Sequence, residues 1–178
     1  MTPRRDFHPL QAVEIARAFE AAEVDYMFLG KGGAILLGYP GTTQDVDVFV
    51  ARSRENAERI LVALRNAGFL IEDALAREIR SQKDFVQIKS GPFDVDLIFA
   101  PDGIESFEAA KARRVELGMF RVANLRDIIA SKRASNRQKD LVDLPLLEAF
   151  REEYERLNPK PLRTASEIAD ERTGGAKE

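Results

Sequence analysis

The sequence predicts an α/β fold in which a small mixed β-sheet is flanked by helices and followed by a short helical carboxyl-terminal element. Short apolar runs of strand length alternate with amphipathic segments of helical period. A chain of 178 residues with 44% apolar content is long enough to bury one core. We expect a core over residues 1–123, a helical element packed on it over 124–157, and a flexible tail over 158–178.

The first third of the chain predicts two strands joined through a glycine-rich turn. Apolar residues at helical spacing predict a helix over 9–22, and an apolar run at 26–29 predicts a strand. Gly-Lys-Gly-Gly at 30–33 is expected to be a turn, followed by a short buried helix over 34–37. The run at 45–50 predicts the second strand.

The middle of the chain predicts a helix and then a hairpin. Ser53 is a suitable N-cap, and Gly68 a suitable end, for a helix with Ile60 and Leu64 on its apolar face. Ser-Gly-Pro at 90–92 separates two strand-like runs and predicts a β-hairpin.

The last third is expected to be mainly helical. Residues 104–112 predict a helix, and residues 114–122 predict two short strands around Gly118. Asn124 is expected to cap the next helix, which precedes a second one. Pro145 in this stretch must lie in a first turn or mark a kink, and the sequence leaves both open.

Composition excludes several kinds of chemistry. The chain has no Cys, so disulfides, thiolate nucleophiles and sulfur-ligated metal sites are excluded, and its single histidine, His8, leaves almost no parts for Ser/His catalysis. The net charge of -3 gives no overall attraction for nucleic acid. We expect no secretory signal, no membrane association and a cytoplasmic location, since no segment approaches about 20 consecutive apolar residues.

Two pairs of aspartates carry the strongest chemical signal. The alternation of a strand places Asp45 and Asp47 on one face, and the run Phe-Asp-Val-Asp-Leu-Ile-Phe places Asp94 and Asp96 on one face. If the two strands are neighbours, these carboxylates converge. Oxygen ligands without His or Cys favour Mg²⁺, or alternatively Mn²⁺. The glycines of 30–33 can bring backbone N–H groups close to phosphates.

These motifs resemble the signature of the DNA polymerase β-like nucleotidyltransferase superfamily: a strand, a glycine turn, Asp-x-Asp, and a third Asp on a neighbouring strand. The segment Gly-Tyr-Pro-Gly-Thr-Thr-Gln-Asp-Val-Asp at 38–47 is similar to the G-x-P-R-x-T-x-D-h-D block of minimal bacterial members, including toxin-antitoxin and abortive-infection components. Residues 125–132 and 137–144 resemble their downstream helix pair. The resemblance covers roughly residues 26–150.

The resemblance implies transfer of a nucleoside monophosphate from a triphosphate to an acceptor hydroxyl, with release of pyrophosphate. The acceptor could be tRNA, a protein or a small molecule, and an antitoxin could be a partner. Asp45, Asp47 and Asp96 would be the catalytic metal ligands, and Asp94 a weaker candidate. The nucleotide-binding candidates are Gly30, Lys31, Gly32, Gly33, Thr43 and Lys132, with Arg137 and Lys139 as contacts to phosphate or acceptor.

Two departures from the pattern leave alternatives open. Gly41 replaces the Arg of the family block, and either Gly32-Gly33 or Gly30-Lys31 can be the phosphate-binding pair. The alternative function is a catalytically silent binding or regulatory module with the same fold. A haloacid dehalogenase-type phosphatase is disfavoured because its Asp-x-Asp follows a buried strand, whereas here the apolar run follows Asp47. A glycosyltransferase would need a larger nucleotide-sugar domain.

Overall fold

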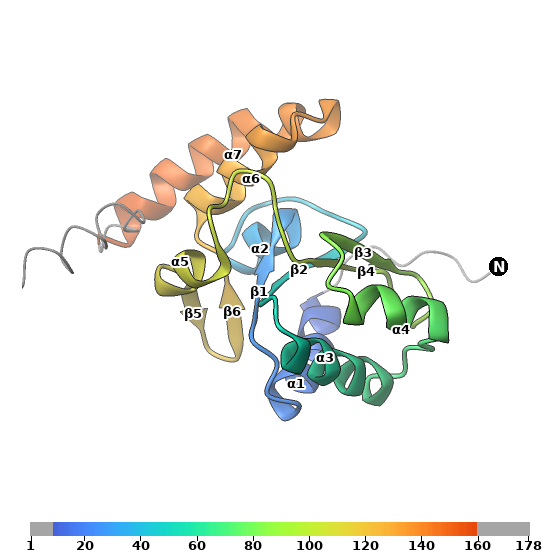
Figure 1. The fold of residues 1–178 in the computed structure, drawn as a ribbon. Helices are drawn as coiled ribbons and strands as arrows, with labels where there is room; N and C mark the ends of the chain where they lie inside the picture. The colour runs from blue at the N-terminus through green and yellow to red at the C-terminus, as the bar shows by residue number, and fades with distance from the viewer. Residues whose placement is uncertain (1–8, 160–178) are drawn as a thin grey trace, which may run out of the picture.

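The computed structural model describes residues 9–159. Within them, a six-stranded mixed sheet with strand order β3-β4-β2-β1-β6-β5 is flanked by helices (Figure 1). The expectations for the leader around His8 and for the tail beyond residue 159 lie outside this range. No helix in the described range combines the length and the apolar character needed to cross a membrane.

The elements follow one another along the chain with short connections. In order they are α1 (Pro9–Ala21), β1 (Tyr26–Leu29), α2 (Gly30–Leu36), β2 (Val46–Val50), α3 (Arg54–Asn66), α4 (Asp73–Arg80), β3 (Phe85–Ile88), β4 (Val95–Ile98), α5 (Phe107–Ala112), β5 (Val115–Leu117), β6 (Phe120–Val122), α6 (Leu125–Ser135) and α7 (Gln138–Leu157).

Strand pairing brings the two aspartate motifs together. Strand β2 pairs antiparallel with β1 and parallel with β4, and the second pairing sets Asp47 opposite Asp96. The predicted hairpin is confirmed, because β3 and β4 pair antiparallel with Gln87 opposite Asp96. Neighbouring strands lie about 4.8 Å apart, so side chains on one face of these three strands are in contact range.

The two faces of the sheet are covered by different helices. Tyr26 of β1 packs edge-to-face on Phe19 of α1, with ring centroids 5.1 Å apart. Phe49 of β2, on the same face as Asp47, packs on Phe107 of α5 at 5.1 Å. Figure 1 shows α1 and α3 on one side of the sheet and α6 and α7 on the other. The acidic side chains therefore lie on the face that α1 and α3 do not cover.

The helix caps predicted from the sequence are confirmed, whereas the start of one predicted helix differs. Ser53 accepts a hydrogen bond from the backbone N–H of Asn56, and Asn124 does so from that of Asp127, so both predicted caps are confirmed. Gly68 has φ +89°, as a glycine that ends a helix often does. The helix predicted over 104–112 begins only at Phe107.

The glycine turn predicted over 30–33 is wrong, because α2 begins at Gly30, directly after β1. Gly30 has φ +64°, a backbone conformation that favours glycine, and this one residue redirects the chain. A Cβ at this position would also overlap the carboxylate of Asp47.

Helix α4 differs from what the sequence predicts, and helix α7 decides between the two positions that the sequence left open for Pro145. Helix α4 was not predicted, because it fully buries only Ala76 and Ile79 and its apolar pattern is short. Pro145 lies well inside one continuous helix, α7, which excludes the first-turn alternative. A proline there cannot donate to the carbonyl of Leu141.

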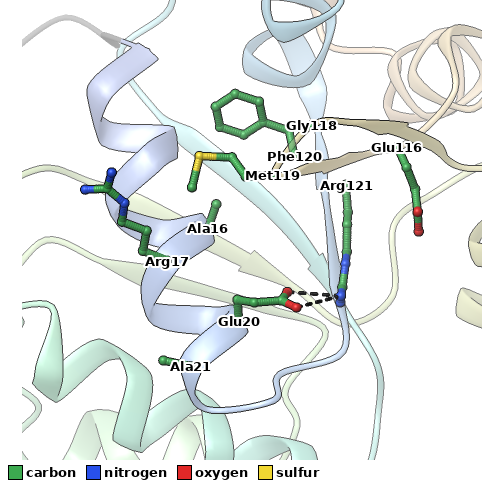
Figure 2. A pocket seen from close by; sticks show the side chains of 9 residues that line it. All are labelled: Ala16, Arg17, Glu20, Ala21, Glu116, Gly118, Met119, Phe120 and Arg121. Atoms are coloured by element: carbon green, nitrogen blue, oxygen red, sulfur yellow. Dashed lines mark hydrogen bonds and ion pairs between the residues drawn. The ribbon is translucent and has the colours of Figure 1, made fainter.

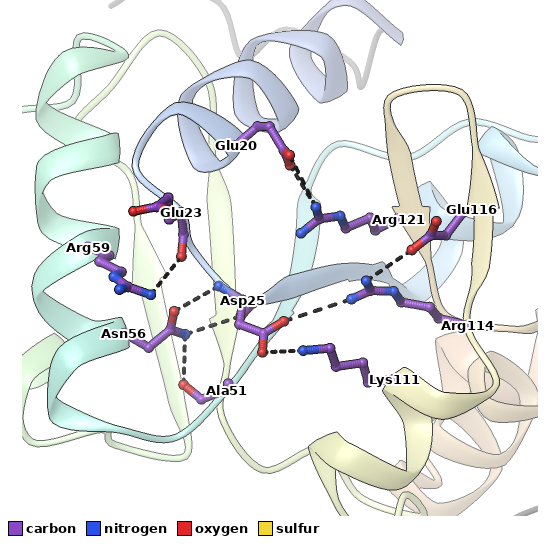
Figure 3. A network of polar contacts seen from close by, with 10 residues as sticks. All are labelled: Glu20, Glu23, Asp25, Ala51, Asn56, Arg59, Lys111, Arg114, Glu116 and Arg121. Atoms are coloured by element: carbon purple, nitrogen blue, oxygen red, sulfur yellow. Dashed lines mark hydrogen bonds and ion pairs between the residues drawn. The ribbon is translucent and has the colours of Figure 1, made fainter.

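A polar network ties the start of β1 to its surroundings, at the end of the strand away from Asp47 (Figure 3). The side chain of Asn56 accepts from the N–H of Asp25 at 2.8 Å and donates to the carbonyls of Asp25 and Ala51. Lys111 donates to the carboxylate of Asp25 at 2.7 Å. This end of the sheet is therefore fixed by paired polar groups.

Candidate functional site

The centre of the candidate site is the pair formed by Asp47 and Asp96. Asp47 is half-buried and Asp96 is only 7% exposed, and they lie opposite one another on parallel strands. Oδ1 of Asp96 is buried and has no hydrogen-bond partner. A buried carboxylate oxygen without a donor is costly, so this site is short of positive charge or of a proton.

The electrostatics of the pair follow from burial and from like charge. Burial, and then the charges of Asp96 and Asp45, raise the pKa of Asp47 to about 8. Burial, followed by the charge of Asp45, raises the pKa of Asp96 to about 6, although hydrogen bonds with Asp47 and then Gln87 oppose the shift. A bound cation would oppose both shifts, because it stabilises the charged forms.

Asp45 and Asp94 lie at the edge of this pair. Strand β2 begins at Val46, so Asp45 precedes the strand that was predicted to contain it. Asp45 nevertheless lines the same cavity, and its charge acts on both Asp47 and Asp96. Asp94 precedes β4, and its charge is the weakest of those that raise the pKa of Asp96.

The four-residue glycine segment divides into two parts. Gly30 touches Asp47, and Lys31 follows it at the cavity wall. Gly32 and Gly33 are buried, and a Cβ at Gly33 would lie 3.3 Å from the backbone of Phe28 and 3.4 Å from the side chain of Ile128. The second pair therefore has a packing role, whereas Gly30 and Lys31 face the carboxylates.

Positive side chains from three segments form the opposite wall of the cavity. Lys132 of α6 lies close enough to Asp47 to oppose the rise in its pKa. It donates to Oδ1 of Asp140 at 3.2 Å, and Lys31 donates to Oδ1 of Asp143 at 3.3 Å. The charge of Lys132 is therefore balanced by the α7 carboxylates Asp140 and Asp143.

Asp140 organises the corner between α6 and α7. It is 2% exposed, and it accepts from Ser135 at 2.7 Å and from Arg137 at 2.8 Å as well as from Lys132. Burial alone would raise the pKa of Asp140, but these hydrogen bonds lower it below its ordinary value. Asp140 therefore stays ionised and fixes two of the site's cations.

The remaining predicted residues surround a cavity of about 510 Å³. Thr43 is half-buried at the rim of this cavity, and Arg137 forms an ion pair with Asp140. Lys139 is exposed and has no ion-pair partner within residues 9–159. The other predicted cations are already paired, so Lys139 is the one whose charge is available to a ligand.

Sequence reasoning missed four residues of this site. Asp140 and Asp143 were read only as part of a similar motif, although their three-residue spacing on one helix face beside a basic stretch was a usable signal. Gln87 and Phe85 of β3 also reach the site. The sequence feature that could have identified them is the alternation of β3, which places Phe85 and Gln87 at its exposed positions.

A second cavity of about 550 Å³ lies between α1 and the β5–β6 hairpin (Figure 2). Its walls include Ala16, Met119 and Phe120, and Glu20 and Arg121 form an ion pair at 3.0 Å across it. Its two carboxylates are each paired with an arginine, Glu20 with Arg121 and Glu116 with Arg114. Chemistry, and not volume, makes the Asp47 cavity the candidate site.

The donor set at Asp47 and Asp96 fits a hard divalent cation. Both are oxygen donors, one oxygen is buried and unpartnered, and both carboxyl groups have raised pKa values. Within residues 9–159, however, no three His, Cys, Asp or Glu side chains are close enough together to form a complete metal cluster. The fit therefore rests on two carboxylates, with Asp45 at the rim.

No protein-family model matches this chain, and no curated protein matches it significantly.

Proposed function

We propose that this protein is a Mg²⁺-dependent nucleotidyltransferase of the DNA polymerase β-like type, which transfers a nucleoside monophosphate from a triphosphate to an acceptor hydroxyl. One observation carries the proposal: Asp47 and Asp96 lie opposite one another on parallel strands, Oδ1 of Asp96 has no hydrogen-bond partner, and lysines line the same cavity. The order of elements, a strand, Gly30, and then carboxylates on two parallel strands, is compatible with it.

Asp47 and Asp96, with Asp45 beside them, would hold Mg²⁺, or Mn²⁺ in its place. When bound, the cation neutralises charge on the triphosphate and on the reacting oxygens. Lys31 and Lys132 would contact the phosphates, exchanging part of their pairing with Asp143 and Asp140. Lys139 would add a charge that is not already paired.

The reaction forms one bond and breaks one. The acceptor oxygen bonds to the α-phosphorus as the bond from that phosphorus to the pyrophosphate oxygen breaks. The proton of the hydroxyl needs an acceptor, and Oδ1 of Asp96 is buried, unpartnered and on the site face. Asp96 would take this proton and later release it to solvent, while Gln87 holds its orientation.

The test is calorimetric titration of each nucleoside triphosphate with Mg²⁺ into wild type, Asp47→Asn and Asp96→Asn. We expect wild type to bind a triphosphate only when Mg²⁺ is present. We expect both variants to bind it at least tenfold more weakly, since each substitution removes a negatively charged ligand. Asp73→Asn on α4 is the matched control, because that carboxylate is exposed and outside the cavity. Absence of triphosphate binding by wild type would overturn the proposal and favour the silent binding module.

A further inference from the structure

Phe85 is an aromatic side chain exposed beside the candidate site. It is 47% exposed and is the only aromatic residue among the large exposed hydrophobic residues of the described range. It lines the Asp47 cavity together with Ile98, its cross-strand neighbour. Most other aromatic rings in residues 9–159 pack against a second ring, whereas no such pairing involves Phe85.

The position of Phe85 relative to the cations is fixed by the order of the strands. Lys31 follows β1, Asp47 is on β2, Asp96 is on β4, and Phe85 is on the outer strand β3. Strand spacing of about 4.8 Å places β3 roughly 15 Å from β1 across the sheet. Phe85 and Lys31 therefore lie on opposite sides of the carboxylate pair.

The geometry of in-line displacement gives the two sides of the carboxylate pair different functions. The attacking and leaving oxygens lie on opposite sides of the phosphorus, so the pyrophosphate and the acceptor approach from opposite directions. Lysines on α2 and α6 suit the pyrophosphate side. The acceptor then approaches over β4 and β3, where Phe85 presents an exposed ring to the cavity.

We propose that Phe85 is the stacking surface for a nucleobase next to the attacked hydroxyl, so that the acceptor is a nucleoside or the 3′ end of a single-stranded nucleic acid. This inference rests on the proposed function. A flat aromatic ring at a cavity rim stacks on any base, because every base has a π-face.

The test compares two fluorescent single-stranded RNA oligonucleotides, one complete and one lacking its 3′-terminal base, by anisotropy with Mg²⁺ present. Wild type is expected to bind the complete oligonucleotide more tightly. Phe85→Ala is expected to weaken that binding by roughly 5- to 150-fold, the effect of losing one base–aromatic stack, and to leave the abasic one unchanged. Phe85→Trp should restore binding, whereas Phe85→Leu, apolar but not planar, should not.

A free nucleoside competing with the complete oligonucleotide distinguishes the two sources of the base. Competition at similar concentration indicates a nucleoside acceptor, and weak competition indicates a nucleic-acid end; both support a base on Phe85. Equal binding of both oligonucleotides to wild type, or no effect of Phe85→Ala, overturns the inference. If Mg²⁺ and triphosphate still bind in that case, the proposed function stands; if they do not bind at all, both fail.

Discussion

Two buried aspartates of nearly equal exposure are treated differently by this fold. Asp127 on α6 is 6% exposed and accepts two hydrogen bonds from Arg113, both at 2.8 Å. Asp96 is 7% exposed, faces the carboxylate of Asp47 and leaves Oδ1 without a donor. The pairing of Asp127 with Arg113 stabilises the fold. Asp96, in contrast, needs positive charge from a ligand or from a proton.

The pKa shifts of Asp127 and Asp96 have causes that differ in the same way. Burial raises the pKa of both carboxyl groups, but Arg113 opposes the shift at Asp127. At Asp96 the next largest cause, the charge of Asp45, adds to the shift. Equal burial therefore does not distinguish a structural carboxylate from a functional one, whereas the charge of the partner does.

The largest expected effect is at the paired aspartate. Arg113→Met leaves Asp127 buried without its cation, and we expect it to lower the free energy of unfolding by about 3–5 kcal/mol in urea denaturation. Arg126→Met is the matched control. Arg126 pairs with Glu155 on the surface, so its loss should cost less than about 1 kcal/mol. Equal losses in the two variants would contradict the comparison.

A smaller effect is expected from neutralising each aspartate in turn. Asp127→Asn weakens charge-assisted bonds, while Arg113 keeps Glu105, and should cost about 1.5–3 kcal/mol. Asp96→Asn should cost nothing or stabilise the metal-free protein, because it removes a charge that has no counter-charge. Urea denaturation at pH 7 with a chelator measures both. A similar loss in Asp96→Asn would mean that its charge is satisfied in the fold.

The third effect is spread over several pH units and is the pH dependence of the metal-free protein. The folded pKa of Asp47, about 8, lies above its ordinary value of about 3.9, so the folded state holds a proton that the unfolded state releases. This contribution to stability is complete below about pH 4 and is lost as pH rises to about 8, by at most about 1.4 kcal/mol per pH unit.

The difference in unfolding free energy between wild type and Asp47→Asn measures this contribution together with its coupling to Asp96, because titrating groups distant from the pair cancel. In the presence of a chelator, we expect this difference in unfolding free energy to fall as the pH rises. With saturating Mg²⁺, we expect it to change little with pH. A difference that rises with pH would mean that the charge of Lys132 outweighs burial and the neighbouring carboxylates at Asp47.

Much of the fold could be predicted from local pattern. Alternating residues identified the strands, Ser53 and Asn124 marked helix starts, and the predicted hairpin is confirmed. Helix α4 escaped prediction because its two fully buried residues give too short a pattern. The helix predicted over 34–37 begins earlier, at Gly30, because Gly30 alone makes the turn. Short elements depend on what packs against them more than on their own sequence.

The sequence by itself determined which side chains share a strand face, since the two-residue period of a strand is local geometry; Asp96 and Ile98 of β4 follow from it. Only the tertiary structure decided that β2 and β4 are neighbours, that Asp47 meets Asp96, and that Asp140 and Asp143 hold the lysines. These contacts join segments distant in sequence, and a carboxylate's charge state depends on burial and neighbours brought together only by folding.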